Sequence, residues 1–190
     1  MDKSKSSDQT NQIETISHAQ SDMRAGYANG SVGIIVSGFI WLISALVVFK
    51  FSDKYGIWTL LIGGMFIYPL SVVLAKILGQ KGTHTEGNPL ANLAMEGTIF
   101  MLMCLPLAFG LSLQHSEWFF QAMLLIIGGR YLTFASIYGN RLYWILGGIL
   151  GISAYLLFGF GIKSLGSAMT GSLIEISFGL FMLITFRKAT

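Results

Sequence analysis

The chain has 190 residues, of which 53% are hydrophobic and 11% are charged, and its formal net charge is +3. Soluble domains carry about 25% charged residues, so this composition excludes a soluble globular domain, a disordered chain, a collagen and a disulfide scaffold. With a mean hydropathy of +0.65, it predicts an all-α, polytopic membrane protein. The single cysteine, Cys104, permits no intrachain disulfide. No basic stripe with interleaved aromatic residues is present, which argues against a nucleic-acid partner.

The first 29 residues are polar and are expected to lie in the cytoplasm, ahead of a six-helix transmembrane domain at 30–190. Residues 1–10 are rich in Ser, Lys and Asp, which predicts a mobile tail. Residues 13–27 have a narrow apolar face, which predicts a helix that lies on the membrane surface or extends the first span.

Six apolar runs follow, each about 20 residues long and therefore able to cross about 30 Å of hydrocarbon. We expect these spans at 31–49, 57–78, 89–113, 118–138, 142–160 and 166–186. Because the connections are short, sequential helices are expected to be antiparallel neighbours. The third span begins at Asn88 and Pro89, a favoured N-cap and a favoured first helical residue, so we interpret Asn88 as a cap rather than a ligand.

Lysine and arginine residues in the short flanks predict the orientation, because they are enriched on the cytoplasmic side. One side of the predicted bundle collects Lys3, Lys5, Arg24, Lys76, Lys81, Arg141, Arg187 and Lys188. The other side collects Lys50, Lys54 and Lys163. Both termini are therefore expected in the cytoplasm.

Weak self-similarity between the spans favours three copies of a helical hairpin. Segments 37–46, 96–105 and 147–156 align on a glycine at the second place, and 60–72 aligns with 125–137. The alternative is that any helices rich in leucine and glycine align equally well. Gly147 and Gly151 have the spacing of small residues that lets helices approach closely, which favours packing within the bundle over a dimer contact.

Three ionisable residues lie within the predicted spans: Glu96, Arg130 and Glu175. With a rise of 1.5 Å per residue, their depths below the cytoplasmic edge are about 10, 12 and 16 Å. Charges in a bilayer normally face protein or water and have a partner, so the shared depth predicts an ion-pair cluster in which Arg130 bridges the two carboxylates. This cluster is either a working pocket or a permanent salt bridge that fixes three helices.

Other polar side chains would complete a crevice that opens to the cytoplasm. Asn92 lies one turn before Glu96, and Thr133 lies three residues after Arg130. Tyr68 falls at a depth of about 15 Å and would join the same layer. The alternative is that these residues only satisfy the charged cluster.

No catalytic or cofactor-binding motif accompanies this predicted site. The sequence has no HExxH, no GxSxG, no phosphate-binding glycine loop and no paired CxxC. His84 and Glu86 are two candidate metal ligands in the polar connection 79–88, too few for a site. We therefore expect no metal and no cofactor, and we assign no catalytic residue.

Four segments resemble a family of small, uncharacterised bacterial six-span membrane proteins. They are GGMFIYPLSV, GNPL, the Glu-Gly-Thr that follows it at 96–98, and EWFFQAMLLIIGGRYLTFASIYG at 117–139. The resemblance covers about 26–186 and implies a multi-pass protein of the bacterial cytoplasmic (inner) membrane. It carries no known activity, so no catalytic role transfers with it.

The leading functional expectation is a protein that binds or transports a small solute or ion through the Glu/Arg pocket in the cytoplasmic half of the bilayer. One alternative is an accessory or assembly subunit without its own substrate. The other, less favoured, is a membrane-embedded enzyme that acts on a lipid-like substrate with a Glu as acid or base. The expected partners are the lipid bilayer, a small solute or ion, and either a second copy or another membrane protein.

Overall fold

A computed structural model describes residues 16–189 as helices joined by short turns. The elements are α2 (Ile16–Tyr27), the 3₁₀ turn η2 (Ala28–Gly30), α3 (Ser31–Lys50), α4 (Asp53–Ile77), α5 (Pro89–Ser112), α6 (Ser116–Tyr138), α7 (Leu142–Gly159) and α8 (Ser164–Ala189). This part of the chain contains no strand, which confirms the predicted all-α fold. Six of its helical segments are long and apolar enough to cross a membrane, as the sequence predicts. The mobile tail predicted at 1–10 lies outside the described residues.

Local signals set the helix ends. The Asn88 side chain accepts a 3.0 Å hydrogen bond from the Leu90 amide, and Pro89 occupies the first turn of α5. The predicted cap is therefore confirmed. Gly139 ends α6 in the left-handed conformation, with a φ of 60°, which glycine adopts at little cost.

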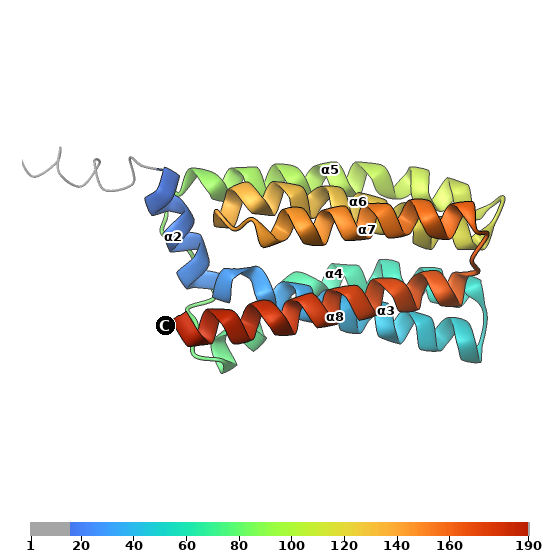
Figure 1. The fold of residues 1–190 in the computed structure, drawn as a ribbon, viewed down its shortest axis with the longest axis horizontal. Helices are drawn as coiled ribbons and strands as arrows, with labels where there is room; N and C mark the ends of the chain where they lie inside the picture. Colours follow the sequence, from blue (N-terminus) through green and yellow to red (C-terminus); the bar gives the residue numbers. More distant parts are fainter. Residues whose placement is uncertain (1–15, 190) are drawn as a thin grey trace, which may run out of the picture.

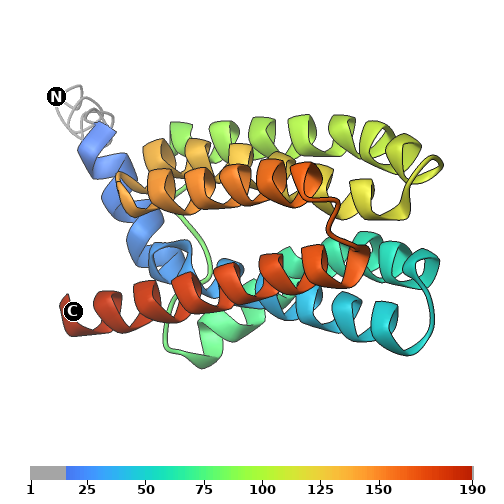
Figure 2. The ribbon, with the colours of Figure 1, turned by 45° about the vertical axis from the view of Figure 1, so that its right-hand side comes forward.

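The six long helices form two layers of three (Figures 1 and 2). In one layer α3 packs between α4 and α8, and in the other α6 packs between α5 and α7. The layers meet mainly where α6 and α7 face α8. Sequential helices therefore do not all pair: α4 and α5 belong to different layers, and α8 packs along α3 far more than against α7. The predicted set of three equivalent hairpins fails at the third, because α8 finds a better surface on α3.

Small residues make the contact between α3 and α8 close. A Cβ atom on Gly38 of α3 would lie 2.9 Å from the Ile176 amide nitrogen, and one on Gly179 of α8 would lie 3.0 Å from the Ile35 amide nitrogen. Between apolar helices in lipid, such close approach replaces the hydrophobic drive that operates in water. This packing places α8 in the layer of α3 and α4 rather than in that of α7.

Helix α2 crosses the end of the bundle at which α8 also ends (Figure 1). Its side chains are tied to the end of α6, because Gln20 donates to the Ser136 carbonyl at 2.7 Å and Arg24 donates to the Tyr138 carbonyl at 2.7 Å. The turn η2 then leads into α3, with Asn29 at a φ of 56°. A helix is thus confirmed within the predicted 13–27, and it closes this end of the bundle.

The outer surface is apolar. Large side chains such as Met65, Phe100 and Tyr155 are exposed by 76%, 66% and 76%, which in water would make an unusually large hydrophobic surface. Trp41 is the contrast: it is buried, and its ring lies 6.3 Å from that of Phe120. Several polar side chains, among them Ser44, Gln121 and Glu175, are instead buried inside the bundle.

Candidate functional site

The centre of the candidate site is Glu175 of α8, a carboxyl group that is fully buried between the two layers. The Tyr131 hydroxyl of α6 donates a 2.9 Å hydrogen bond to Glu175 Oε1. The close contact of α3 with α8 at Gly38 covers the Glu175 Cβ atom from the other side. This hydrogen bond joins α6 to α8 across the layer boundary, as does a longer one of 3.4 Å that Gln121 Nε2 of α6 donates to Ser167 Oγ of α8.

Two oxygen atoms at this site lack hydrogen-bond partners. Within residues 16–189 neither Glu175 Oε2 nor Ser172 Oγ has one, although both are buried. The Ser37 side chain of α3 lies within hydrogen-bonding reach of the Glu175 carboxyl group. Buried polar atoms are normally paired, because an unpaired one costs about 1–3 kcal/mol. The group of Glu175, Ser37, Ser172 and Tyr131, which we term the Glu175 site, therefore has spare capacity for a ligand.

Arg130 precedes Tyr131 and points toward α5. Its Nη2 donates to Thr98 Oγ1 at 2.9 Å, its Nη1 contacts the sulfur of Met101 at 3.5 Å, and its guanidinium carbon lies 5.2 Å from the centroid of the Phe134 ring. Its Nε has no hydrogen-bond partner among the described residues. Within residues 16–189 Arg130 and Glu175 form no ion pair.

The predicted bridge from Arg130 to Glu96 is wrong. Glu96 is exposed on the outer face of α5, and Asn92, one turn earlier, is exposed beside it. The single ion pair within residues 16–189 joins Lys163 to Glu117 at 3.1 Å, at the opposite end of the bundle from α2. Successive helical residues differ by about 100° in direction, so Glu96 points to nearly the opposite side of α5 from the Thr98 side chain that Arg130 binds.

Tyr68 and Thr133 also lie away from the Glu175 site. Tyr68 is 68% exposed, and its hydroxyl lies near that of Tyr27. Thr133 donates at 2.7 Å to the carbonyl of Arg130 in its own helix and faces Gly97 of α5. Of the six predicted site residues, the structure thus brings Arg130 and Thr133 to α5, leaves Asn92, Glu96 and Tyr68 exposed, and buries Glu175.

Aromatic residues next to the Glu175 site were not part of the prediction. Stacked and edge-on contacts join rings from α6 and α7 at centroid distances of 5.5–5.9 Å; the rings are those of Tyr131, Phe134, Tyr138 and Tyr143. The Tyr143 hydroxyl donates to the Asn29 carbonyl at 2.9 Å, which ties the cluster to η2. The helical spacing of the three α6 rings is a signal in the sequence that indicates their shared face.

A second polar group lies where α2 meets the connection between α4 and α5. The Asp22 carboxylate accepts hydrogen bonds from the Thr85 amide, the Thr85 hydroxyl and the Asn88 side chain, at 2.8–2.9 Å. Partial burial raises the pKa of Asp22, but these hydrogen bonds and the nearby His84 outweigh burial, so the pKa lies below its usual value. This group anchors α2 to the bundle. His84 also contacts the Tyr27 hydroxyl at 2.9 Å, and Glu86 is exposed.

Comparison with known proteins places the chain in one family. No curated protein and no solved structure matches the sequence. A protein family described as "Family of unknown function (DUF7010)" matches residues 16–185, which includes all the long helices almost completely. Since the match covers most of the chain, the protein belongs to this family of unknown function.

Proposed function

We propose that the protein spans the membrane and binds or transports a small ion at the Glu175 site. The observation that supports this function is the fully buried carboxyl group of Glu175, with one unpaired oxygen beside the unpaired Ser172 hydroxyl. An ionisable residue inside a membrane is costly and commonly marks an ion or proton path. Because the available donor atoms are carboxylate and hydroxyl oxygens, the fitting ligands are a proton or an alkali cation.

An ion-binding site of this kind needs a conformational change that opens it to solvent, and the two-layer architecture supports such a change. Glu175 is sealed from solvent, so an ion reaches it only when side chains at the layer boundary separate. The contacts between layers are far fewer than those within each layer. Relative movement of the α5–α6–α7 layer against the α3–α4–α8 layer is therefore the least costly way to open the Glu175 site.

An accessory role is the second candidate, and the Tyr131–Glu175 hydrogen bond favours it. A dry link between the layers stabilises the bundle without any solute passing through. In that case Glu175 would never exchange its proton with solvent. The two functions therefore differ in whether Glu175 exchanges its proton with solvent, which can be measured.

Infrared spectroscopy of the protein in liposomes measures that property. If Glu175 is a working site, the carbonyl band of a protonated carboxyl group should titrate with pH, shift in D₂O and change when Na⁺ or K⁺ is added. Glu175→Gln should remove this band, whereas the matched control Glu86→Gln, in the exposed connection, should retain it. A Glu175 band that is insensitive to pH, D₂O and both cations would reject the ion-binding function and leave the accessory one.

The orientation with both termini in the cytoplasm of a bacterial cell is part of this proposal. The asymmetry of Lys and Arg supports it, and α2 and the end of α8 lie at the same end of the bundle (Figure 1). In a Cys104→Ala background, an impermeant thiol reagent should label a cysteine at position 54 in intact cells, but not one at position 86. The reverse pattern would contradict the orientation.

A further inference from the structure

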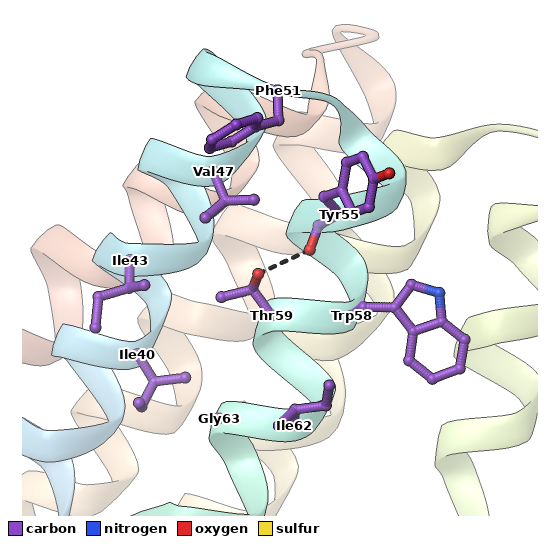
Figure 3. Close-up of a pocket in the computed structure, with 9 residues that line it drawn as sticks. All are labelled: Ile40, Ile43, Val47, Phe51, Tyr55, Trp58, Thr59, Ile62 and Gly63. Carbon is purple, nitrogen blue, oxygen red and sulfur yellow. Dashed lines mark hydrogen bonds between the residues drawn. The ribbon is translucent and has the colours of Figure 1, made fainter.

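An apolar groove runs along the outside of α3 and α4, near the turn that joins them (Figure 3). It has a volume of about 710 Å³ and is open along one side. Its lining consists of Ile40, Ile43, Val47, Phe51, Tyr55, Trp58, Thr59, Ile62 and Gly63. The groove shares no residue with the Glu175 site.

The polar atoms in the groove are already satisfied or lie at its edge. The Thr59 hydroxyl donates to the Tyr55 carbonyl at 2.8 Å, so it offers its methyl group rather than a free donor (Figure 3). Gly63 contributes no side chain, and a Cβ atom there would meet the Ile40 side chain at 2.5 Å. The groove therefore fits a slender hydrocarbon better than a polar solute.

The length of the groove matches one leaflet of a bilayer. From Ile40 to Phe51 the lining extends over eleven helical steps, which is about 17 Å. Half of the hydrocarbon core is about 15 Å. A single acyl chain that enters from the leaflet nearest the α3–α4 turn would therefore fill the groove from end to end.

Positive charge gathers at the end of the groove where a lipid headgroup would lie. Lys50 ends α3 and Lys54 begins α4, both are exposed, and neither forms an ion pair within the described residues. The acidic residue between them, Asp53, is turned toward α8, where it accepts a 2.7 Å hydrogen bond from the Ser164 hydroxyl. Lys163 at the same end is paired with Glu117. Two free ammonium groups thus remain at the mouth.

We propose that this groove binds one acyl chain of an anionic phospholipid, with the lipid phosphate held by Lys50 and Lys54. Tyr55 and Trp58 line the α4 side of the groove and are exposed, as amphipathic aromatic side chains near a membrane surface are. The Trp58 ring is turned toward α5, where it lies 5.8 Å from the ring of Phe109 (Figure 3). The headgroup charge is what distinguishes this site from ordinary contact with bulk lipid. The site is independent of the ion-binding function proposed for Glu175.

Quenching of Trp58 fluorescence by brominated acyl chains tests the site directly. The protein is placed in phosphatidylcholine vesicles that contain either brominated phosphatidylglycerol or brominated phosphatidylcholine. The Trp58 signal is the difference between the parent and Trp58→Phe. In the parent protein we expect the affinity for phosphatidylglycerol, measured by this quenching, to exceed that for phosphatidylcholine about 30-fold. The ratio should fall to about 5-fold when one lysine is replaced, and the preference should disappear when both are replaced.

Charge variants and a second tryptophan provide the controls. Lys50→Gln with Lys54→Gln should equalise the two lipids at Trp58, and these exposed changes should leave thermal unfolding unchanged. Trp144 of α7 is 60% exposed and lines no part of this groove, so its signal, from Trp144→Phe, should be quenched equally by both lipids. Equal quenching of Trp58 by the two lipids in the parent protein would overturn the proposal and leave only bulk lipid contact.

A variant that fills the groove gives an independent measurement. Thr59→Phe places a ring where the acyl chain would lie, so it should abolish the preference for phosphatidylglycerol while both lysines remain. If Thr59→Phe folds and keeps the preference, the lysines attract lipid without the groove, and the acyl-chain site is wrong.

Discussion

Arg130 and Tyr131 are neighbours in the sequence, yet Arg130 binds Thr98 within its own layer whereas Tyr131 binds Glu175 in the other. The separation of about 100° between adjacent helical side chains produces this division. One residue joins α6 to α5, and the next joins α6 to α8. The two contacts can therefore be tested separately, by substitutions at Tyr131 and at Arg130.

Tyr131→Phe should destabilise the protein by about 1–3 kcal/mol, because it removes the hydrogen bond that the Tyr131 hydroxyl donates to the buried Glu175 carboxyl group. Thermal unfolding in detergent measures the change. Tyr155→Phe is the matched control, since Tyr155 is 76% exposed on α7. Parent-like stability of Tyr131→Phe would mean that the hydrogen bond contributes nothing.

Arg130→Ala should destabilise the bundle by about 1.5–3 kcal/mol, the range for a hydrogen bond that involves a charged group. Because Glu96 points away from Arg130, adding Glu96→Gln should not restore stability. Arg141→Ala, which changes an exposed arginine, is the control. Thermal unfolding of Arg130→Ala, with and without Glu96→Gln, measures this in detergent. Rescue by Glu96→Gln would show that Arg130 and Glu96 pair.

Gly147→Ala should destabilise the contact of α6 with α7 by about 1–3 kcal/mol, since its Cβ atom would lie 2.6 Å from the Gly128 carbonyl oxygen. Gly148→Ala is a control on the same helix, because nothing lies within 4 Å of its Cβ position. That control should gain up to about 1 kcal/mol of helix propensity. Equal unfolding temperatures for the two variants would contradict the close packing.

The contact of Asp22 with the connection 79–88 should depend on pH. A carboxyl group with a lowered pKa stabilises the fold above its unfolded pKa of about 3.9, and this contribution is lost as the pH falls through the folded value. Hydrogen exchange at 79–88 should therefore show additional opening below about pH 4. Asp22→Asn should already show this opening at neutral pH, whereas Glu86→Gln should not. Identical protection in Asp22→Asn and the parent would contradict the anchor.

The sequence predicts how far along a helix a residue lies better than it predicts which face of the helix that residue occupies. Span limits predicted six helices correctly, and the estimated depth of Arg130 agrees with its contacts, because Thr98 lies only two residues beyond Glu96. What the sequence did not reveal is which face of α5 meets α6. Lipid-facing helices are apolar on all sides, so the pattern of hydrophobic residues does not identify the inner face.

The pairing of helices was likewise outside the reach of local patterns. Short connections predict antiparallel neighbours, which is correct for α3 with α4, for α5 with α6 and for α6 with α7. The choice of α3 by α8 depends on glycines far apart in the sequence, Gly38 and Gly179, that allow close approach. Such complementarity appears only when both surfaces are known.

The packing of α8 along α3 has a consequence for how the protein is made. Among the six long helices α3 is synthesised first and α8 last, so their contact is the slowest kind to form, one between distant parts of the chain. Until α8 is synthesised, the glycine face of α3 and the Tyr131 hydroxyl remain without their partners. Biosynthesis therefore completes the bundle and the Glu175 site in a single final step.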